Sequence, residues 1–98
     1  MNGVVIDDGV LVRALKFWGV ESQMDMVIEE CLELALALQK LKRKRGDVEQ
    51  KVLNVIDEIA DVKIMLRQAE IVFGEEAVNK RVEFKISRLE GRIEEGLS

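Results

Sequence analysis

Acidic residues recur in two matched clusters inside otherwise apolar stretches of the chain. Each cluster has two adjacent acids and a third acid three residues beyond the second. The members are Glu29, Glu30 and Glu33 in VIEECLELALAL (27–38), and Asp57, Glu58 and Asp61 in VIDEIADVKIML (55–66). Carboxylate oxygens are the ligands that hard divalent cations such as Mg²⁺ and Mn²⁺ prefer, and a positioned carboxylate can also take a proton from water.

The spacing of these acids places each cluster on one face of a helix, because residues three and four apart are neighbours on the helix surface. A helical hairpin centred between residues 45 and 46 makes Glu33 and Glu58 equidistant from the turn, and likewise Glu30 and Asp61. Helices packed roughly 8–10 Å apart would then aim four carboxylates at one small volume. Unpaired like charges in an apolar setting cost several kcal/mol or shift their pKa values. A bound Mg²⁺ or Mn²⁺ would relieve that repulsion.

Helix signals along the chain define the elements that must position these acids. Asp7 or Asp8 and Ser22 are expected as the N-caps of the first two helices, and Asp47 with Gln50 as a capping box for the third. Glycines are expected to end the helices. The predicted helices run from Asp7 or Asp8 to about Trp18, from Ser22 to about Lys44, from Asp47 to about Phe73, and from Glu75 to about Glu95.

The composition favours a single all-α domain over residues 1–98, with residues 1–6 as a flexible arm or extended lead-in. The chain has no proline and no tyrosine, and it combines 48% hydrophobic with 35% charged residues, a profile typical of amphipathic helices. We expect an antiparallel helical hairpin plus flanking helices. The segment 22–44 is apolar on more than one face, so a four-helix-bundle-like core would be completed by forming a homodimer or homotetramer.

Several classes of function are disfavoured by what the chain contains. It has no histidine, which excludes Ser-His-Asp and Cys-His catalysis. A net charge of −4 argues against general nucleic-acid binding. No signal peptide or apolar run long enough to cross a bilayer is visible, so a soluble cytoplasmic protein is the default expectation. Cys31 is the single cysteine, and its apolar neighbours predict a core position.

Basic and aromatic residues offer candidate contacts for an anionic ligand. The run KLKRKR (40–45) falls at the expected hairpin turn, where it is either a solvated helix end or a phosphate or nucleic-acid contact. On the last helix, Lys85 and Arg88 are the pair we would choose to hold a polyanionic substrate from the side opposite the metal. Trp18 is either a core or interface residue, or a side chain on which a nucleobase stacks.

Glu29-Glu30-x-x-Glu33 followed, after a gap of 24 residues, by Glu58-x-x-Asp61 resembles the signature of the MazG-like all-α nucleoside triphosphate pyrophosphohydrolases. The resemblance runs from about Trp18 to the last helix. It implies an oligomeric helical bundle that cleaves a nucleoside triphosphate to a monophosphate and pyrophosphate with Mg²⁺.

The resemblance also implies roles for individual residues. Glu30, Glu33, Glu58 and Asp61 match the metal-binding positions, and Glu29 matches a leading acid that supports the site or activates water. Lys85 and Arg88 resemble the basic residues of the family's last helix, whereas an asparagine found beside them in relatives has no clear counterpart here. A dUTPase-type, dCTPase-type or phosphoribosyl-nucleotide activity is left open. So are a non-catalytic oligomeric adaptor and a metal-binding bundle without turnover.

Overall fold

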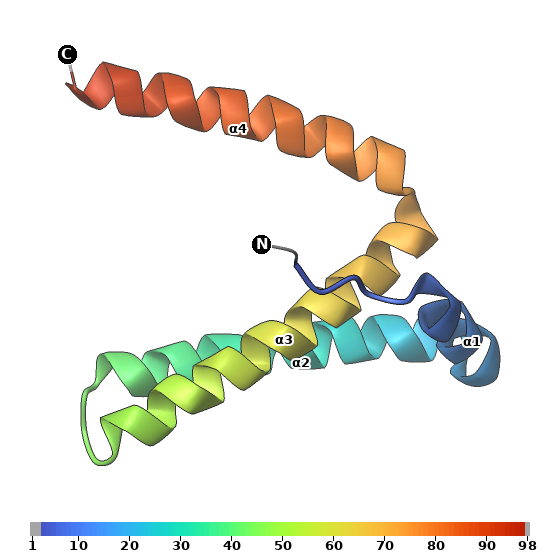
Figure 1. Ribbon diagram of the computed structural model, residues 1–98, viewed down its shortest axis with the longest axis horizontal. Helices are drawn as coiled ribbons and strands as arrows, with labels where there is room; N and C mark the ends of the chain where they lie inside the picture. Colours follow the sequence, from blue (N-terminus) through green and yellow to red (C-terminus); the bar gives the residue numbers. More distant parts are fainter. Residues whose placement is uncertain (1–2, 98) are drawn as a thin grey trace.

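A computed structural model describes residues 3–97, and within that range the chain forms helices and no strand (Figure 1). The helices are α1 (Asp8–Trp18), α2 (Val20–Lys42), α3 (Val48–Phe73) and α4 (Glu75–Leu97). The all-α prediction is therefore confirmed for this range. Residues 3–7 lead into α1 without regular structure, and the first two residues of the expected arm lie outside the described residues.

Helices α2 and α3 form the antiparallel hairpin that the acidic clusters require (Figure 1). They have 23 and 26 residues, which corresponds to lengths of about 35 and 39 Å. The five residues 43–47 connect them, with Lys44 and Gly46 at positive φ. The Asp47 side chain accepts a hydrogen bond of 3.0 Å from the backbone N–H of Gln50, which is one half of the predicted capping box. The Gln50 side chain instead donates to the Asn54 carbonyl. The connection is thus centred at residue 45, half a residue from the expected centre between residues 45 and 46.

Gly19 joins α1 to α2 without any intervening loop. Its φ of 93° suits glycine, and its N–H donates to the Leu15 carbonyl at 2.9 Å to close α1. Helix α2 then begins at once at Val20, so Ser22 lies inside its first turn. The prediction of Ser22 as an N-cap is wrong, because one glycine both ends the first helix and starts the second.

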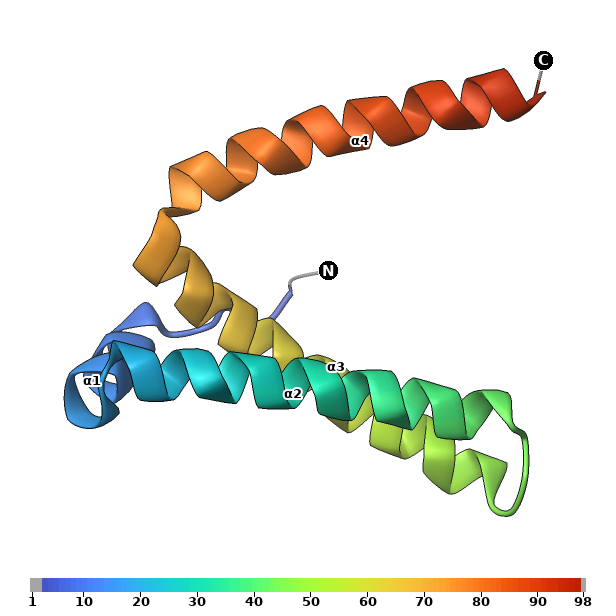
Figure 2. The same ribbon diagram turned by 180° about the vertical axis from the view of Figure 1, so that it is seen from behind.

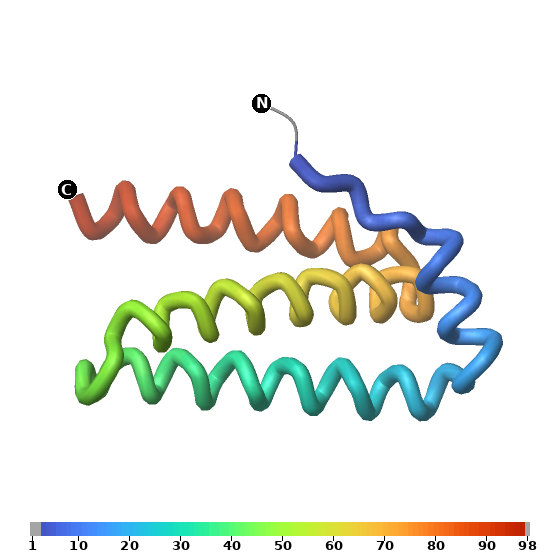
Figure 3. The backbone as a smooth tube through the Cα atoms, turned by 60° about the horizontal axis from the view of Figure 1, so that its bottom comes forward, coloured from blue at the N-terminus to red at the C-terminus, as the bar shows by residue number. Residues whose placement is uncertain are grey.

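Helix α4 leaves the end of α3 at Gly74 and runs back above the hairpin (Figures 1 and 2). Among the helices of residues 3–97 it contacts α3 alone, whereas α1 contacts both α2 and α3. The tube view shows that α4 follows the direction of the hairpin back toward its turn (Figure 3). Most of its surface is therefore left uncovered by its own chain.

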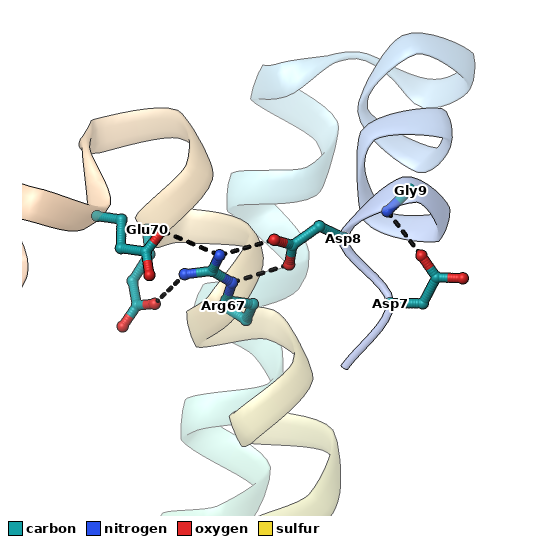
Figure 4. Close-up of polar contacts among 6 residues, drawn as sticks. Asp7, Asp8, Gly9, Arg67 and Glu70 are labelled. Carbon is teal, nitrogen blue, oxygen red and sulfur yellow. Dashed lines mark hydrogen bonds and ion pairs between the residues drawn. The ribbon is translucent and has the colours of Figure 1, made fainter. Parts of the chain in front are cut away.

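Arg67 of α3 links the three helices that meet at this end of the molecule (Figure 4). Its guanidinium forms two hydrogen bonds with the Asp8 carboxylate of α1, at 2.7 and 2.9 Å. It also contacts Glu70 at 3.0 Å and Glu75, the first residue of α4, at 3.1 Å. These hydrogen bonds lower the pKa of Asp8 and raise that of Arg67. The arginine thereby helps to fix both α1 and the start of α4 relative to the hairpin.

The core of the single chain is small for its length. Within residues 3–97 the buried side chains are Leu11, Gln23, Val55, Val62 and Gln68. The accessible surface is 8022 Å², against about 5,700 Å² for a compact monomer of this mass. The radius of gyration is 16.8 Å, against about 13 Å for a compact domain of this length.

Much of the uncovered surface is apolar. Cys31 is exposed, so the prediction that it lies in the core is wrong for the single chain. Helix α2 is apolar on several faces, but only one of them packs against α3. Apolar neighbours in the sequence therefore could not show that Cys31 is exposed. No helix within residues 3–97 combines the length and the apolarity that crossing a membrane requires.

Candidate functional site

Three carboxylates converge between α2 and α3. Ligand oxygens of Glu30, Glu33 and Glu58 all lie within 4.8 Å of one another. Glu30 and Glu33 share a face of α2, one helical turn apart, and Glu58 comes from the facing turn of α3. The pairing of the two helices around residue 45 brings them together, as the register of the hairpin predicts.

The other predicted acids lie around this group. Asp61 is outside the 4.8 Å cluster, yet its charge contributes to raising the pKa values of both Glu30 and Glu58. Glu29 is exposed on α2 beside Glu30, whose pKa it also raises. The structure therefore gathers three of the four predicted metal ligands tightly and keeps the fourth within electrostatic reach.

Glu30 and Glu58 are half-buried and Glu33 is exposed. One oxygen each of Glu30 and Glu58, the Oε2 atom, is buried without a hydrogen-bond donor in the described chain. Burial raises the pKa of both groups, and the charge of Glu33 adds to this effect. A buried acceptor without a donor is costly, and a cation is one way to satisfy it.

The donor set fits a hard divalent cation. Two ligand oxygens on one Mg²⁺ lie at most about 4.2 Å apart, because each Mg–O distance is about 2.1 Å. The observed limit of 4.8 Å is within a small side-chain adjustment of that value. Glu30, Glu33 and Glu58 could hold such an ion, with Asp61 as the nearest further carboxylate. Water molecules would complete the octahedron that Mg²⁺ requires.

An apolar pocket of about 420 Å³ lies on the side of the acids away from the turn. It is lined by α1, α2 and α3, and its members include Trp18, Met26, Met65 and Gln68. Met26 and Met65 each stand one helical turn from a predicted acid, Glu30 in one case and Asp61 in the other. Trp18 is 61% exposed at this pocket. Its placement matches an interface or stacking residue and contradicts a core position within the single chain.

Gln68 is the polar group of this pocket that the sequence did not single out. Its side chain is fully buried, and its Nε2 donates to the Leu11 carbonyl at 3.3 Å. Because that carbonyl can only accept, the amide orientation is set and the Gln68 Oε1 faces elsewhere. This oxygen has no donor in the described chain.

A second pocket, of about 290 Å³, lies on the other side of the acids, toward the hairpin turn. Glu33 and Glu58 form one end, and Lys40, Lys51 and Asn54 also line it. The sequence offered Lys40 only as part of the basic run at the turn, and it did not single out Lys51 or Asn54. The residue numbers could have found them, because Lys40 and Lys51 are equidistant from the turn.

Lys85 and Arg88 do not meet the acids within the described chain. Both are exposed on α4, which contacts only α3 among the helices of residues 3–97, and neither lines the apolar pocket or the pocket at the turn. Their assignment to the substrate stays a prediction that needs another copy of the chain or a movement of α4.

The raised carboxyl pKa values predict how stability depends on pH. Folded Glu30 and Glu58 hold protons above their ordinary pKa of 4.5, so the folded chain binds more protons than the unfolded chain in the window between that value and the raised values. In that pH window, the contribution of these two groups to the free energy of unfolding falls as pH rises. In EDTA, the gain in melting temperature from Glu58→Gln should be larger at about pH 7.5 than at about pH 5. An equal gain at both pH values would contradict the coupling.

Comparison with known proteins adds no assignment. No family model matches the chain, and neither a curated protein nor a solved structure matches it. The candidate site therefore stands on its geometry and on the motif that carries the MazG-like resemblance.

Proposed function

We propose that this chain is a Mg²⁺-dependent, MazG-like nucleoside triphosphate pyrophosphohydrolase, which cleaves a (d)NTP to a (d)NMP and pyrophosphate. The observation that carries the proposal is the carboxylate cluster. Glu30, Glu33 and Glu58 converge from two helices, and two of the three carry a buried oxygen without a donor. Acids that are only surface groups would point into the solvent, where water hydrates both carboxylate oxygens, and they would not converge.

The roles follow from chemistry and position. Glu30, Glu33, Glu58 and Asp61 would hold Mg²⁺ or Mn²⁺, which supplies charge neutralisation at the phosphate oxygens and a more acidic bound water. Glu29, exposed beside the cluster, is the carboxylate that takes the proton of the attacking water. The water oxygen bonds to the α-phosphorus while the bond from that phosphorus to the bridging oxygen breaks. Pyrophosphate departs, and no covalent enzyme intermediate forms.

The pocket beside Trp18 is the proposed site of the base. Its lining is mostly apolar, and stacking on an aromatic side chain contributes about 1–3 kcal/mol per base. Met26 and Met65 connect this pocket to the acids, so a base and its phosphates can occupy both places at once.

The functional form is proposed to be a homodimer or homotetramer. The single chain exposes roughly 2,300 Å² more surface than a compact monomer would. A surplus of that size on each of two chains falls in the range of obligate dimer interfaces. Because Lys85 and Arg88 of α4 do not reach the clustered acids of their own chain, they would contact the substrate of a neighbouring subunit. The same proposal places the enzyme in the cytoplasm, with its nucleotide substrates.

A product assay tests the proposal directly. The purified protein is incubated with a panel of NTPs and dNTPs and Mg²⁺, and the products are separated by ion-exchange chromatography. Monophosphate with pyrophosphate is the expected result, and its loss in EDTA and return with Mg²⁺ is the matched control. Release of diphosphate with orthophosphate would contradict the proposal. Metal binding without turnover would favour the metal-binding bundle, and neither property would favour the adaptor.

A further inference from the structure

The face of the hairpin that carries the acids changes character in a fixed order along its length. Facing residues are equidistant from the turn, and successive pairs are three or four residues apart, so they share one stripe. From the end near α1 to the turn, the pairs are Gln23 and Gln68, Met26 and Met65, Glu30 and Asp61, Glu33 and Glu58, Ala37 and Asn54, and Lys40 and Lys51. Amide and apolar groups thus come first, acids next and cations last.

The two pockets lie on this stripe on opposite sides of the acids. The apolar pocket contains the first two pairs, Gln23 with Gln68 and Met26 with Met65. The pocket at the turn contains the last three pairs, which are Glu33 with Glu58, Ala37 with Asn54, and Lys40 with Lys51. Lys40 follows Glu33 by seven positions, which is about 10.5 Å along the helix. Two linked phosphates extending from the acids span part of that distance, and the flexible four-carbon stems of the lysine side chains can span the rest.

The two lysines are not used to neutralise the acids of the same pocket. Within residues 3–97, neither Lys40 nor Lys51 forms an ion pair, and the Lys51 ammonium instead donates to the Arg45 carbonyl. The Asn54 carbonyl accepts from Gln50 at 3.0 Å, which leaves the Asn54 N–H groups as the free donors. Cations and an amide donor therefore face one cavity together with three carboxylates, those of Glu33, Asp57 and Glu58.

On the basis of the proposed function, we propose that Lys40, Lys51 and Asn54 form an anion subsite for the terminal phosphates of the substrate. The nucleotide then lies along the hairpin with its base toward α1 and its β- and γ-phosphates toward the turn. The two lysines pair with phosphate oxygens, and the Asn54 amide donates to another. The subsite supplies, from the same chain, cations on the side of the acids opposite the base.

Binding of inorganic pyrophosphate in the presence of Mg²⁺ tests the subsite without any turnover. The full chain is titrated by calorimetry as wild type, as Lys40→Gln with Lys51→Gln, and as the control Lys42→Gln with Lys63→Gln. The control removes the same charge, and it includes a lysine of the same basic run, but neither residue lines the pocket. The first double variant should bind pyrophosphate at least about tenfold more weakly for each lysine removed, and the control should bind as wild type does. Equal affinities in the two double variants, or no binding by the wild type, would overturn the subsite.

A nucleoside monophosphate is the internal comparison, because it has no terminal phosphates. Its affinity should be unchanged by Lys40→Gln with Lys51→Gln, whereas the KM for the triphosphate should rise. Asn54→Asp keeps the side-chain shape and adds a negative charge, and it should weaken pyrophosphate binding but spare the monophosphate. Equal weakening of both ligands would overturn the proposed orientation.

The two proposals can fail separately. If the wild type hydrolyses triphosphates and the lysine variants behave as the control, the subsite is wrong and the enzyme assignment stands. If the lysines are needed for pyrophosphate binding but no triphosphate is hydrolysed, the subsite stands and the enzyme assignment is wrong.

Discussion

Glu58→Gln should lower the rate of triphosphate hydrolysis by at least about 10²–10³-fold while the chain stays folded. Glu58 contributes one of the three converging carboxylates, and its buried Oε2 has no protein donor. An amide has nearly the same shape but no charge, so the affinity for Mg²⁺ falls along with the rate. Initial rates and calorimetric titration with Mg²⁺ or Mn²⁺ measure the two effects. Glu33→Gln and Asp61→Asn should behave in the same way.

A change in stability cannot account for this loss if the cluster is as described. Removal of one charge from a group of repelling carboxylates should leave the melting temperature in EDTA equal to or above that of the wild type. Glu49→Gln is the matched control, because it makes the same chemical change at an exposed position of α3 outside the cluster. If Glu58→Gln hydrolyses triphosphate at the wild-type rate, or if Glu49→Gln loses as much of that rate, the clustered carboxylates have no specific part in the mechanism.

Ile86→Glu combined with Leu89→Glu should convert the proposed oligomer to monomers or to unfolded chain. Both residues are more than half exposed in the single chain, on a helix that contacts only α3. They belong to an apolar stripe of α4 made of Val78, Val82, Ile86, Leu89 and Ile93. Covering two unpaired carboxylates in an apolar interface costs several kcal/mol. Light scattering coupled to size-exclusion chromatography gives the mass of each variant.

The control for this experiment is Ser87→Glu, which lies about 140° around the helix from Val82 and so faces away from the stripe. It should keep the mass of the wild type and its thermal stability. If Lys85 and Arg88 act from a neighbouring subunit, a folded monomer should still bind Mg²⁺ but should show a raised KM for the triphosphate. A monomeric wild type at micromolar concentration, or an unchanged mass in the double variant, would contradict the oligomer.

The acidic cluster could be predicted because it depends on two local properties. Helical spacing decides which residues share a face, and the turn decides which residues oppose one another. Asp47 and Gly46 mark that turn clearly in the sequence, and the structure centres the connection at residue 45. Glu33 and Glu58 then meet by register alone.

Predictions for single residues that were based on their sequence neighbours were less successful. Apolar neighbours suggested a buried Cys31, but a long helix packs only one face against its partner, and this residue lies elsewhere. The capping assignment at Ser22 failed because Gly19 allows α2 to start three residues earlier than the serine would. Lys40 and Lys51 were passed over as pocket residues, although the register that pairs the acids pairs them too.

The sequence by itself determined the helices, the hairpin and the meeting of its carboxylates, because these follow from backbone hydrogen bonding, helical periodicity and one well-marked turn. Only the tertiary structure decided the path of α4 and the burial of Gln68. Those features depend on the angle at Gly74, on where α1 packs and on the ion pairs of Arg67. Such contacts join residues far apart in the chain, and no local pattern encodes them.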